Sequence, residues 1–149
     1  MDIEIATVVF DCSDPKALSE FWESATGLEV ADEEDDWVLL ADPEVEDGGG
    51  IQLGFQLVPE RKSVKNRLHL DLYAHGVEET AEWMQSLGAV RLWVSDDPDD
   101  IFITLADPEG NEFCVVEAAP EDEPEDEPED VDDADDELLL SHEGLDEQE

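Results

Sequence analysis

Residues 39–44 read Leu-Leu-Ala-Asp-Pro-Glu, and residues 104–109 read Thr-Leu-Ala-Asp-Pro-Glu. In both stretches an apolar run stops at an Asp-Pro pair, which is typical of a strand that ends in a turn. A second pair of segments, Ser-Glu-Phe-Trp-Glu-Ser at 19–24 and Ala-Glu-Trp-Met-Gln-Ser at 81–86, repeats 62 residues apart. A repeat of about 60 residues is too long for a solenoid unit. The repeat therefore predicts two copies of one module.

The pattern around these segments predicts the order strand, helix and three strands in each half. In the first half, Asp14 is a plausible helix N-cap, Pro15 suits the first helical position and Gly27 ends the helix. Its strands are expected at 3–10, 28–31, 37–41 and 51–58. In the second half the helix is expected at 77–87, ended by Gly88, and the strands at 67–74, 89–94, 101–106 and 112–117.

The fold class is therefore α+β, with two β-α-β-β-β modules at about 1–58 and 67–118 in one domain of residues 1–118. The stretch Asp-Pro-Glu-Gly-Asn at 107–111 is interpreted as the turn between the last two strands, where Pro108 presets φ and Gly110 supplies a positive φ. From 119 to 149 the sequence turns into acidic runs interrupted by proline. Such a composition predicts a disordered tail.

The charge balance is extreme, with 46 acidic against 6 basic residues and a net charge of −40. Residues 120–149 hold 17 of the acids and no Lys or Arg, so residues 1–119 alone carry about −23. A body this acidic repels itself unless salt screens it, which favours an origin in the cytoplasm of a salt-loaded halophile. An ordinary acidic protein, or one that binds a basic partner, is the alternative.

Several classes of function are disfavoured by the same composition. Nucleic-acid binding needs a basic footprint, which is absent. No apolar run approaches the roughly 18 residues of a membrane span, and the N-terminus lacks the pattern of a signal peptide. Cys12 and Cys114 form neither a disulfide framework nor a zinc motif. A cytoplasmic protein is expected.

Three segments, in order and spacing, resemble the glyoxalase-like branch of the vicinal oxygen chelate superfamily, which includes glyoxalases, bleomycin resistance proteins and dioxygenases. They are Asp-Cys-Ser-Asp-Pro-Lys-Ala-Leu-Ser-Glu-Phe-Trp at 11–22, Asn-Arg-Leu-His-Leu-Asp-Leu at 66–72 and Leu-Ala-Asp-Pro-Glu-Gly-Asn-Glu-Phe at 105–113. The similarity extends over residues 3–118. It implies paired modules in a pseudo-twofold arrangement whose sheets curl into a cleft, often completed by a homodimer.

In metal-dependent members of the superfamily, one side chain from each of four strands binds a divalent cation. The resemblance places these positions at Thr7, Gln52, His69 and Cys114, where active members usually have Glu at the last one. Mg²⁺, Mn²⁺ or Fe²⁺ prefer carboxylates and imidazoles, and only His69 is a strong ligand here. The donor set therefore disfavours a divalent metal and favours a metal-free cleft.

Strand alternation extends the predicted cleft. Residues on the His69 face of its strand include Asp71 and Tyr73, whereas Leu68, Leu70 and Leu72 are expected under the helix. The ligand-binding cleft is thus predicted at Thr7, Gln52, Gln56, His69, Asp71, Tyr73 and Cys114. His69 and Asp71 are candidates for a catalytic acid–base pair, with a structural polar pair as the alternative. Trp37, Trp83 and Trp93 are assigned to the core.

Four of the six basic residues lie just before His69, namely Arg61, Lys62, Lys65 and Arg67. They are expected either to attract an anionic ligand or to bind the protein's own acidic surface or tail across a dimer. Two functions follow from the whole pattern. The first is the binding of a small metabolite or drug-like ligand without a metal. The second is a metal-dependent lyase, isomerase or dioxygenase that acts on a small oxygenated metabolite.

Overall fold

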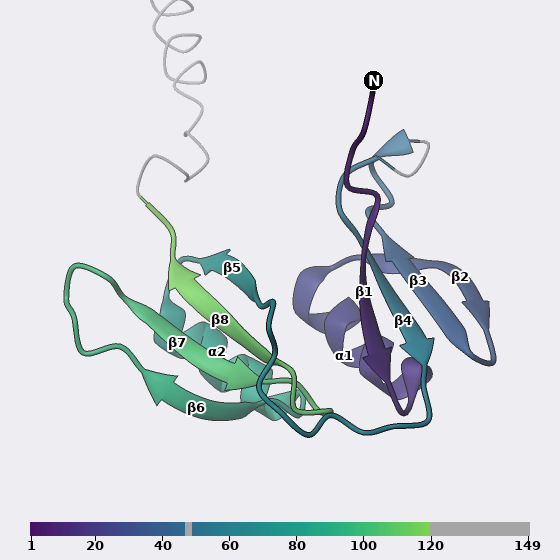
Figure 1. Cartoon of the computed structure of the whole chain (residues 1–149). Coiled ribbons are helices and arrows are strands. Elements are labelled where there is room, and N and C mark those ends of the chain that lie inside the picture. The colour runs from purple at the N-terminus through teal and green to yellow at the C-terminus, as the bar shows by residue number, and fades with distance from the viewer. Residues whose placement is uncertain (47–48, 120–149) are drawn as a thin grey trace, which may run out of the picture. The chain divides into compact units, whose positions relative to one another are not determined.

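Each helix lies against one face of a four-stranded sheet of its own, and the other face of the sheet is free of helices (Figure 1). The first module consists of β1 (Thr7–Cys12), α1 (Pro15–Thr26), β2 (Glu29–Glu34), β3 (Trp37–Ala41) and β4 (Gln52–Leu57). The second consists of β5 (Leu70–Ala74), α2 (Val77–Ser86), β6 (Val90–Val94), β7 (Phe102–Ala106) and β8 (Glu112–Glu117). The predicted α+β class with two β-α-β-β-β modules is confirmed.

The computed structural model describes residues 1–46 and 49–119. Within it, Met1–Ala118 form one compact unit, so the two modules belong to a single body. The acidic tail predicted at 119–149 lies, apart from Ala119, outside the described residues. In the part of the chain that is described, no helix is long and apolar enough to cross a membrane.

The two sheets have the same topology. Their strand orders are β1-β4-β3-β2 and β5-β8-β7-β6. In each sheet the first strand pairs in parallel with the last one, and the other pairs are antiparallel. Thr7 lies opposite Gln52 in the first sheet, and Asp71 lies opposite Cys114 in the second.

The start and end of α1 follow the predicted local signals. The Asp14 side chain accepts a hydrogen bond from the Ala17 backbone N–H at 3.1 Å, and Pro15 occupies the first turn. Gly27 ends the helix with φ of 81°, a conformation that glycine adopts at little cost. The N-cap, the proline and the terminating glycine are therefore confirmed.

Two strands begin three or more residues later than predicted. Ile3 and Ile5 are exposed and precede β1, because β4 begins at Gln52 and offers no partner before Thr7. Leu68 precedes β5 and is 74% exposed, so its expected position under the helix is wrong. Leu70 and Leu72 do pack against the core as predicted.

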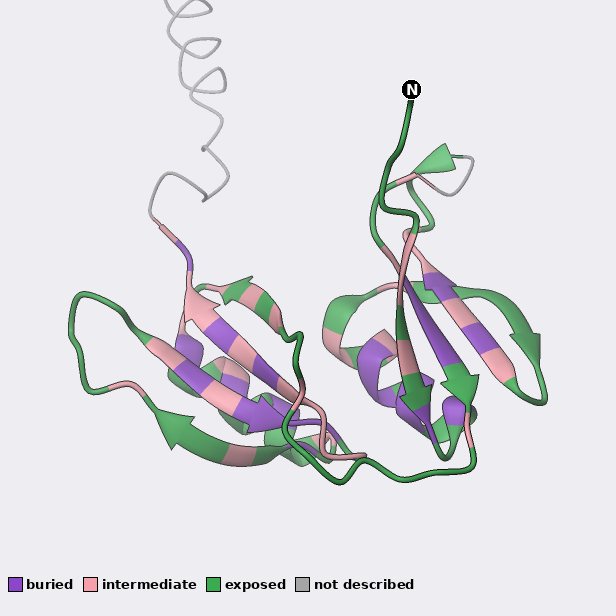
Figure 2. Cartoon of the chain, in the orientation of Figure 1, coloured by how far each residue is buried: buried purple, intermediate pink, exposed green. Residues whose placement is uncertain are grey.

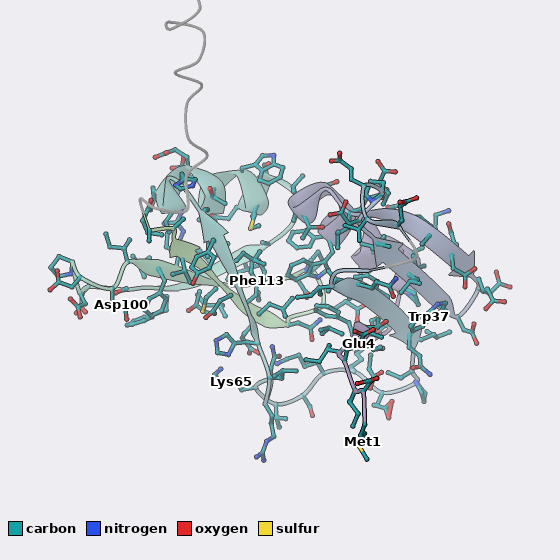
Figure 3. The ribbon with its side chains drawn as sticks, turned by 90° about the horizontal axis from the view of Figure 1, so that it is seen from above. Met1, Glu4, Trp37, Lys65, Asp100 and Phe113 are labelled. Atoms are coloured by element: carbon teal, nitrogen blue, oxygen red, sulfur yellow. The ribbon has the colours of Figure 1, made fainter. Side chains whose placement is uncertain are left out.

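The core lies between the helices and the sheets, where buried residues alternate with less buried ones along the strands (Figure 2). Trp22 is fully buried at its centre, with its ring 5.0 Å from that of Phe113 in the other module; Figure 3 shows Phe113 where the two modules meet. The assignment of the other tryptophans to the core is wrong. Trp83 and Trp93 are about half exposed, and Trp37 is only partly buried. Trp83 lies on α2, where the buried residues are Val77, Ala81 and Met84, and Trp93 lies on β6.

Candidate functional site

The predicted cleft residues of the first sheet form a polar pair. Thr7 on β1 donates a hydrogen bond from Oγ1 to Gln52 Oε1 on β4 at 3.1 Å, and both side chains are partly buried. The pair forms because the parallel register places the two residues opposite each other. Gln56, two residues beyond Gly54 on β4, is exposed.

The predicted residues of the second sheet form a separate cluster. His69 Nε2 lies 3.2 Å from Asp71 Oδ1, as strand alternation predicted for neighbours on one face. Cys114, opposite Asp71, completes a group whose donor atoms lie within 4.8 Å of one another. The Cys114 thiol also contacts Thr104 Oγ1 at 3.3 Å. Tyr73 is 74% exposed on the same strand.

Three aromatic residues on the helix-free faces were missed by the sequence interpretation. Trp37 lies directly over Gly54, where a Cβ atom would come within 2.4 Å of the indole ring. Trp93 and Phe102 pair on the second sheet with ring centroids 5.3 Å apart. Trp37 alternates with the buried residues Val38 and Leu40. That alternation was the signal that could have placed Trp37 on the open face.

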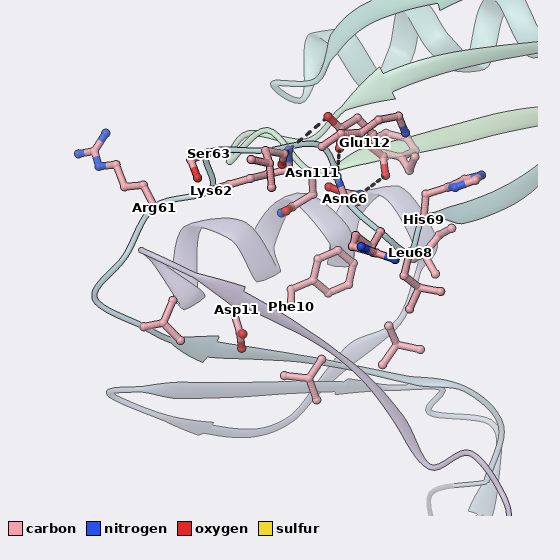
Figure 4. A pocket seen from close by; sticks show the side chains of 18 of the residues that line it. Phe10, Asp11, Arg61, Lys62, Ser63, Asn66, Leu68, His69, Asn111 and Glu112 are labelled. Atoms are coloured by element: carbon pink, nitrogen blue, oxygen red, sulfur yellow. Dashed lines mark hydrogen bonds and ion pairs between the residues drawn. The ribbon is translucent and has the colours of Figure 1, made fainter.

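A cavity of about 610 Å³ lies beside β1, between this strand and the connector of residues 58–69 (Figure 4). Among the seven predicted cleft residues, only His69 lines it. The other six therefore lie outside this cavity. Its apolar lining residues are Val8, Val9, Phe10, Trp22, Val58, Val64, Leu68, Leu70 and Phe113.

Glu112 anchors the connector over this cavity. Its carboxylate accepts a hydrogen bond from the Asn66 backbone N–H at 3.0 Å and lies 3.2 Å from Lys62 Nζ, and its carbonyl accepts one from Asn66 Nδ2 at 2.8 Å (Figure 4). Burial alone raises the pKa of Glu112, but the bonds from Asn66 and Lys62 outweigh it and lower the pKa below its ordinary value. The anchor is thus ionised at neutral pH and weakens only as the pH falls through that lowered pKa.

The 107–111 turn joins the two modules and so does more than connect two strands. The Asp107 carboxylate is buried and accepts a hydrogen bond from Trp22 Nε1 on α1 at 3.0 Å. It also accepts bonds from the Glu109 and Asn111 backbone N–H groups and from Asn111 Nδ2. This turn contributes Asn111 to the cavity lining and fixes β8 beside α1.

Residues 7–116 match the family model of the glyoxalase-like domain. The chain belongs to the glyoxalase-like domain family. No protein of curated function matches it in sequence. The match extends from the first residue of β1 almost to the end of β8, so both modules of this glyoxalase-like protein belong to the family domain.

Solved structures with a similar fold include three whose names suggest different activities. A glyoxalase/bleomycin resistance protein/dioxygenase family enzyme from Burkholderia phytofirmans PsJN has a TM-score of 0.63 and 17% identity, over 78% of this chain and 100% of that one. A fosfomycin resistance protein, FosX, from Listeria monocytogenes was solved with Mn(II) and 1S,2S-dihydroxypropylphosphonic acid. It has a TM-score of 0.65 and 12% identity, over 81% of this chain and 94% of that one. A lactoylglutathione lyase from Agrobacterium tumefaciens has a TM-score of 0.56 and 19% identity, over 77% of this chain and 93% of that one. At these identities the likeness establishes the fold alone.

The donor atoms of this glyoxalase-like protein do not fit a hard divalent cation. In the first sheet, Gln52 Oε1 would be the stronger metal ligand of the Thr7–Gln52 pair. This oxygen already accepts the hydrogen bond from Thr7. The second sheet offers one imidazole, one carboxylate and one thiol, whereas Mg²⁺ and Mn²⁺ prefer several oxygen ligands. A mixed set of nitrogen, oxygen and sulfur is closer to the preference of zinc.

Proposed function

We propose that this glyoxalase-like protein binds a small metabolite or drug-like molecule without a divalent metal, in the cavity beside β1. The observation that carries the proposal is the cavity itself, whose volume of about 610 Å³ lies within the usual range of small-molecule sites. Aromatic and aliphatic side chains make up much of the lining, and His69, Asn66 and Asn111 add polar groups. Such a mixture suits a planar apolar body with a few polar substituents.

A fluorescent neutral probe, N-phenyl-1-naphthylamine, tests this proposal on the full-length protein. We expect saturable binding with a stoichiometry of one per chain, unchanged by EDTA. Leu68 lines the cavity yet is 74% exposed, so Leu68→Asp should reduce binding without unfolding the chain. Leu92→Asp is the matched control, because Leu92 is 50% exposed on β6 and does not line the cavity. Equal losses in the two variants, or loss on EDTA treatment, would contradict the proposal.

The second candidate is a metal-dependent lyase, isomerase or dioxygenase. The clustering of His69, Asp71 and Cys114 within 4.8 Å favours it, and in that case His69 and Asp71 serve as an acid–base pair. Dialysis against Zn²⁺, Mn²⁺, Ni²⁺ or Fe²⁺ followed by metal analysis is the test. Stoichiometric uptake that is lost in both His69→Ala and Cys114→Ser would replace the metal-free proposal with this one.

We further propose that the chain is a cytoplasmic homodimer from a high-salt environment. Exposed apolar side chains on the second module, including Tyr73, Trp93 and Val94, support a partner surface. The net charge of about −23 on residues 1–119 supports the salt requirement. Sedimentation in 2 M KCl should give twice the chain mass, and circular dichroism should show loss of structure at 20 mM KCl. A monomer would contradict the homodimer, and equal stability at both salt concentrations would contradict the salt requirement.

A further inference from the structure

The connector concentrates positive charge in an otherwise acidic protein. Arg61, Lys62, Lys65 and Arg67 lie within seven residues and all line the cavity beside β1. Elsewhere the chain has only Lys16 and Arg91, and each pairs with a carboxylate: Lys16 with Glu33 at 4.0 Å and Arg91 with Glu78 at 2.9 Å. The sequence left open whether the connector cations serve the protein's own acidic surface or a ligand.

The ion pairs distinguish these alternatives. Lys62 pairs with Glu112 and so holds the connector in place. Within residues 1–46 and 49–119, no ion pair joins Arg61, Lys65 or Arg67 to a carboxylate. Among the described residues, three cations thus have no carboxylate partner, although residues 1–119 hold more than four acids for every base. Within the part of the chain that the structure describes, internal pairing accounts for Lys62 alone.

The cavity combines these cations with an apolar wall. Asp11 and Glu60 also line it, so the three unpaired cations exceed the unpaired acids by one, whereas the body as a whole is strongly negative. The amide side chains of Asn66 and Asn111 and the His69 ring add hydrogen-bonding groups. Phe10, Trp22 and Phe113 contribute aromatic rings to the same lining. A lining that joins cations with aromatic and aliphatic side chains is complementary to a molecule that carries an anionic group on an apolar body.

We propose that the cavity selects an organic anion, a carboxylate, phosphonate or sulfonate carried on an aromatic or aliphatic body, and that Lys65 and Arg67 bind its negative group. This inference rests on the proposed ligand-binding function and names the class of ligand. Lys62 positions the connector through Glu112 and does not bind the anion. The acidic remainder of the surface disfavours anions elsewhere, so the connector sets the place at which they bind.

Two dyes with one skeleton test the inference. 8-Anilinonaphthalene-1-sulfonate is N-phenyl-1-naphthylamine with an added sulfonate, so the pair isolates the negative group. Titrations use the full-length protein at a salt concentration where circular dichroism shows it folded. In the variant Lys65→Gln/Arg67→Gln, we expect the sulfonate to bind about tenfold more weakly and the neutral dye to be affected less than about twofold.

The matched control is Lys16→Gln/Arg91→Gln, which removes the same formal charge at positions that do not line the cavity. It should leave both dyes within about threefold of wild type, because exposed charges are screened over a few ångströms at high salt. Lys65→Arg/Arg67→Lys retains the charge and should retain most of the sulfonate affinity.

Each outcome bears on a different proposal. Equal loss of sulfonate binding in the two Gln variants, or equal loss of the two dyes in Lys65→Gln/Arg67→Gln, would overturn the anion inference while the ligand-binding cavity stands. Failure of both dyes to bind wild type would overturn both proposals, whereas binding of the neutral dye without the sulfonate would overturn the anion inference alone.

Discussion

The two modules share a topology and one turn sequence, but they use that turn differently. In both Ala-Asp-Pro-Glu stretches the Asp carboxylate accepts a hydrogen bond from the backbone N–H two residues on, at 3.0 Å in Asp42 and 2.9 Å in Asp107. Asp107 also binds Trp22 of the other module. Asp42 and Glu44 make no such contact with α2 among the described residues. The local turn is therefore the same, and only its docking differs.

The helices show the consequence of this difference. Phe21 on α1 is 3% exposed, since it packs beside Trp22 and 6.2 Å from the Phe113 ring of the second module. Trp83, which occupies the matching position 62 residues later, is 47% exposed. Phe113 of the second module contacts Phe21 on α1, whereas Trp83 on α2 has no ring contact among the described residues. A repeated sequence thus specifies two similar modules without specifying two similar environments.

The largest predicted effect comes from the matching aromatic residues. Phe21→Ala should reduce the free energy of unfolding by about 3–4 kcal/mol, because it leaves a cavity among the rings of the core. Trp83→Ala should cost less than about 1 kcal/mol, because much of the side chain already contacts solvent. Urea unfolding of both variants in high salt measures the difference. Similar losses would show that α2 is covered as α1 is.

The two Asp residues give the next effect. Asp107→Asn should cost about 2–3 kcal/mol, because every contact of this carboxylate is a donor and the new amide N–H₂ would face one of them. Asp42→Asn should cost less than about 0.5 kcal/mol, because the amide oxygen can still accept the bond from the Glu44 N–H. Chemical unfolding at pH 7 separates the two cases, and equal costs would contradict the interlocking role of Asp107.

The difference in stability between wild type and Asp107→Asn should also depend on pH. Burial raises the pKa of Asp107 above its ordinary value, against the hydrogen bonds from Asn111, Trp22 and Glu109 that lower it. The folded state therefore holds this proton more tightly than the unfolded chain does. The stability advantage of wild type over Asp107→Asn should shrink as the pH rises from the ordinary to the raised pKa and be constant above it. An advantage that grows over this range would contradict the raised pKa.

A smaller effect on stability is expected at Glu109 and Glu44, the glutamates two residues after Asp107 and Asp42. The Glu109 carboxylate accepts hydrogen bonds from the Ser13 and Asp14 backbone N–H groups at 2.8 Å each, just before α1. Glu109→Gln should cost about 1 kcal/mol, because it removes a negative charge from the N-terminus of the helix. Glu44→Gln, at the matching exposed position, should leave stability unchanged within about 0.3 kcal/mol. Thermal unfolding at moderate salt is the measurement, and equal shifts would contradict the capping role.

The two cysteines are expected to differ in their reactivity toward an alkylating reagent. Burial, with Glu109 nearby, raises the pKa of the Cys12 thiol to about 12. Cys114 is only partly buried on the second sheet. Iodoacetamide at pH 8 should therefore label Cys114 in the folded protein and Cys12 only after unfolding, as mass spectrometry of peptides would show. Labelling of Cys12 at the faster rate would contradict this order.

Much of the fold could be predicted because its signals are local. The cap at Asp14, the glycine at 27 and the alternation along β5 each depend on residues a few positions apart. The starts of β1 and β5 could not be predicted, since they depend on where a distant strand offers a partner. For the same reason, Leu68 was assigned to the core although the chain is not yet a strand there.

The candidate site divides in the same way. The contact between His69 and Asp71 follows from alternation on one strand and was predicted. The cavity could not be, because the connector and β1 lie more than 40 residues apart in the chain. Nor could the sequence show which of the connector cations has a partner, because Glu112 reaches Lys62 only after β8 has joined β5.

By itself, the sequence determined the two modules, their caps and turns and the acidic character, because short-range hydrogen bonds and side-chain alternation are written into neighbouring residues. Only the tertiary structure decided which Ala-Asp-Pro-Glu turn is buried, which aromatic side chains face solvent and where a ligand-sized cavity opens. Those outcomes depend on surfaces from distant segments that meet only when the modules pack. Two identical turns can therefore differ in what they hold together.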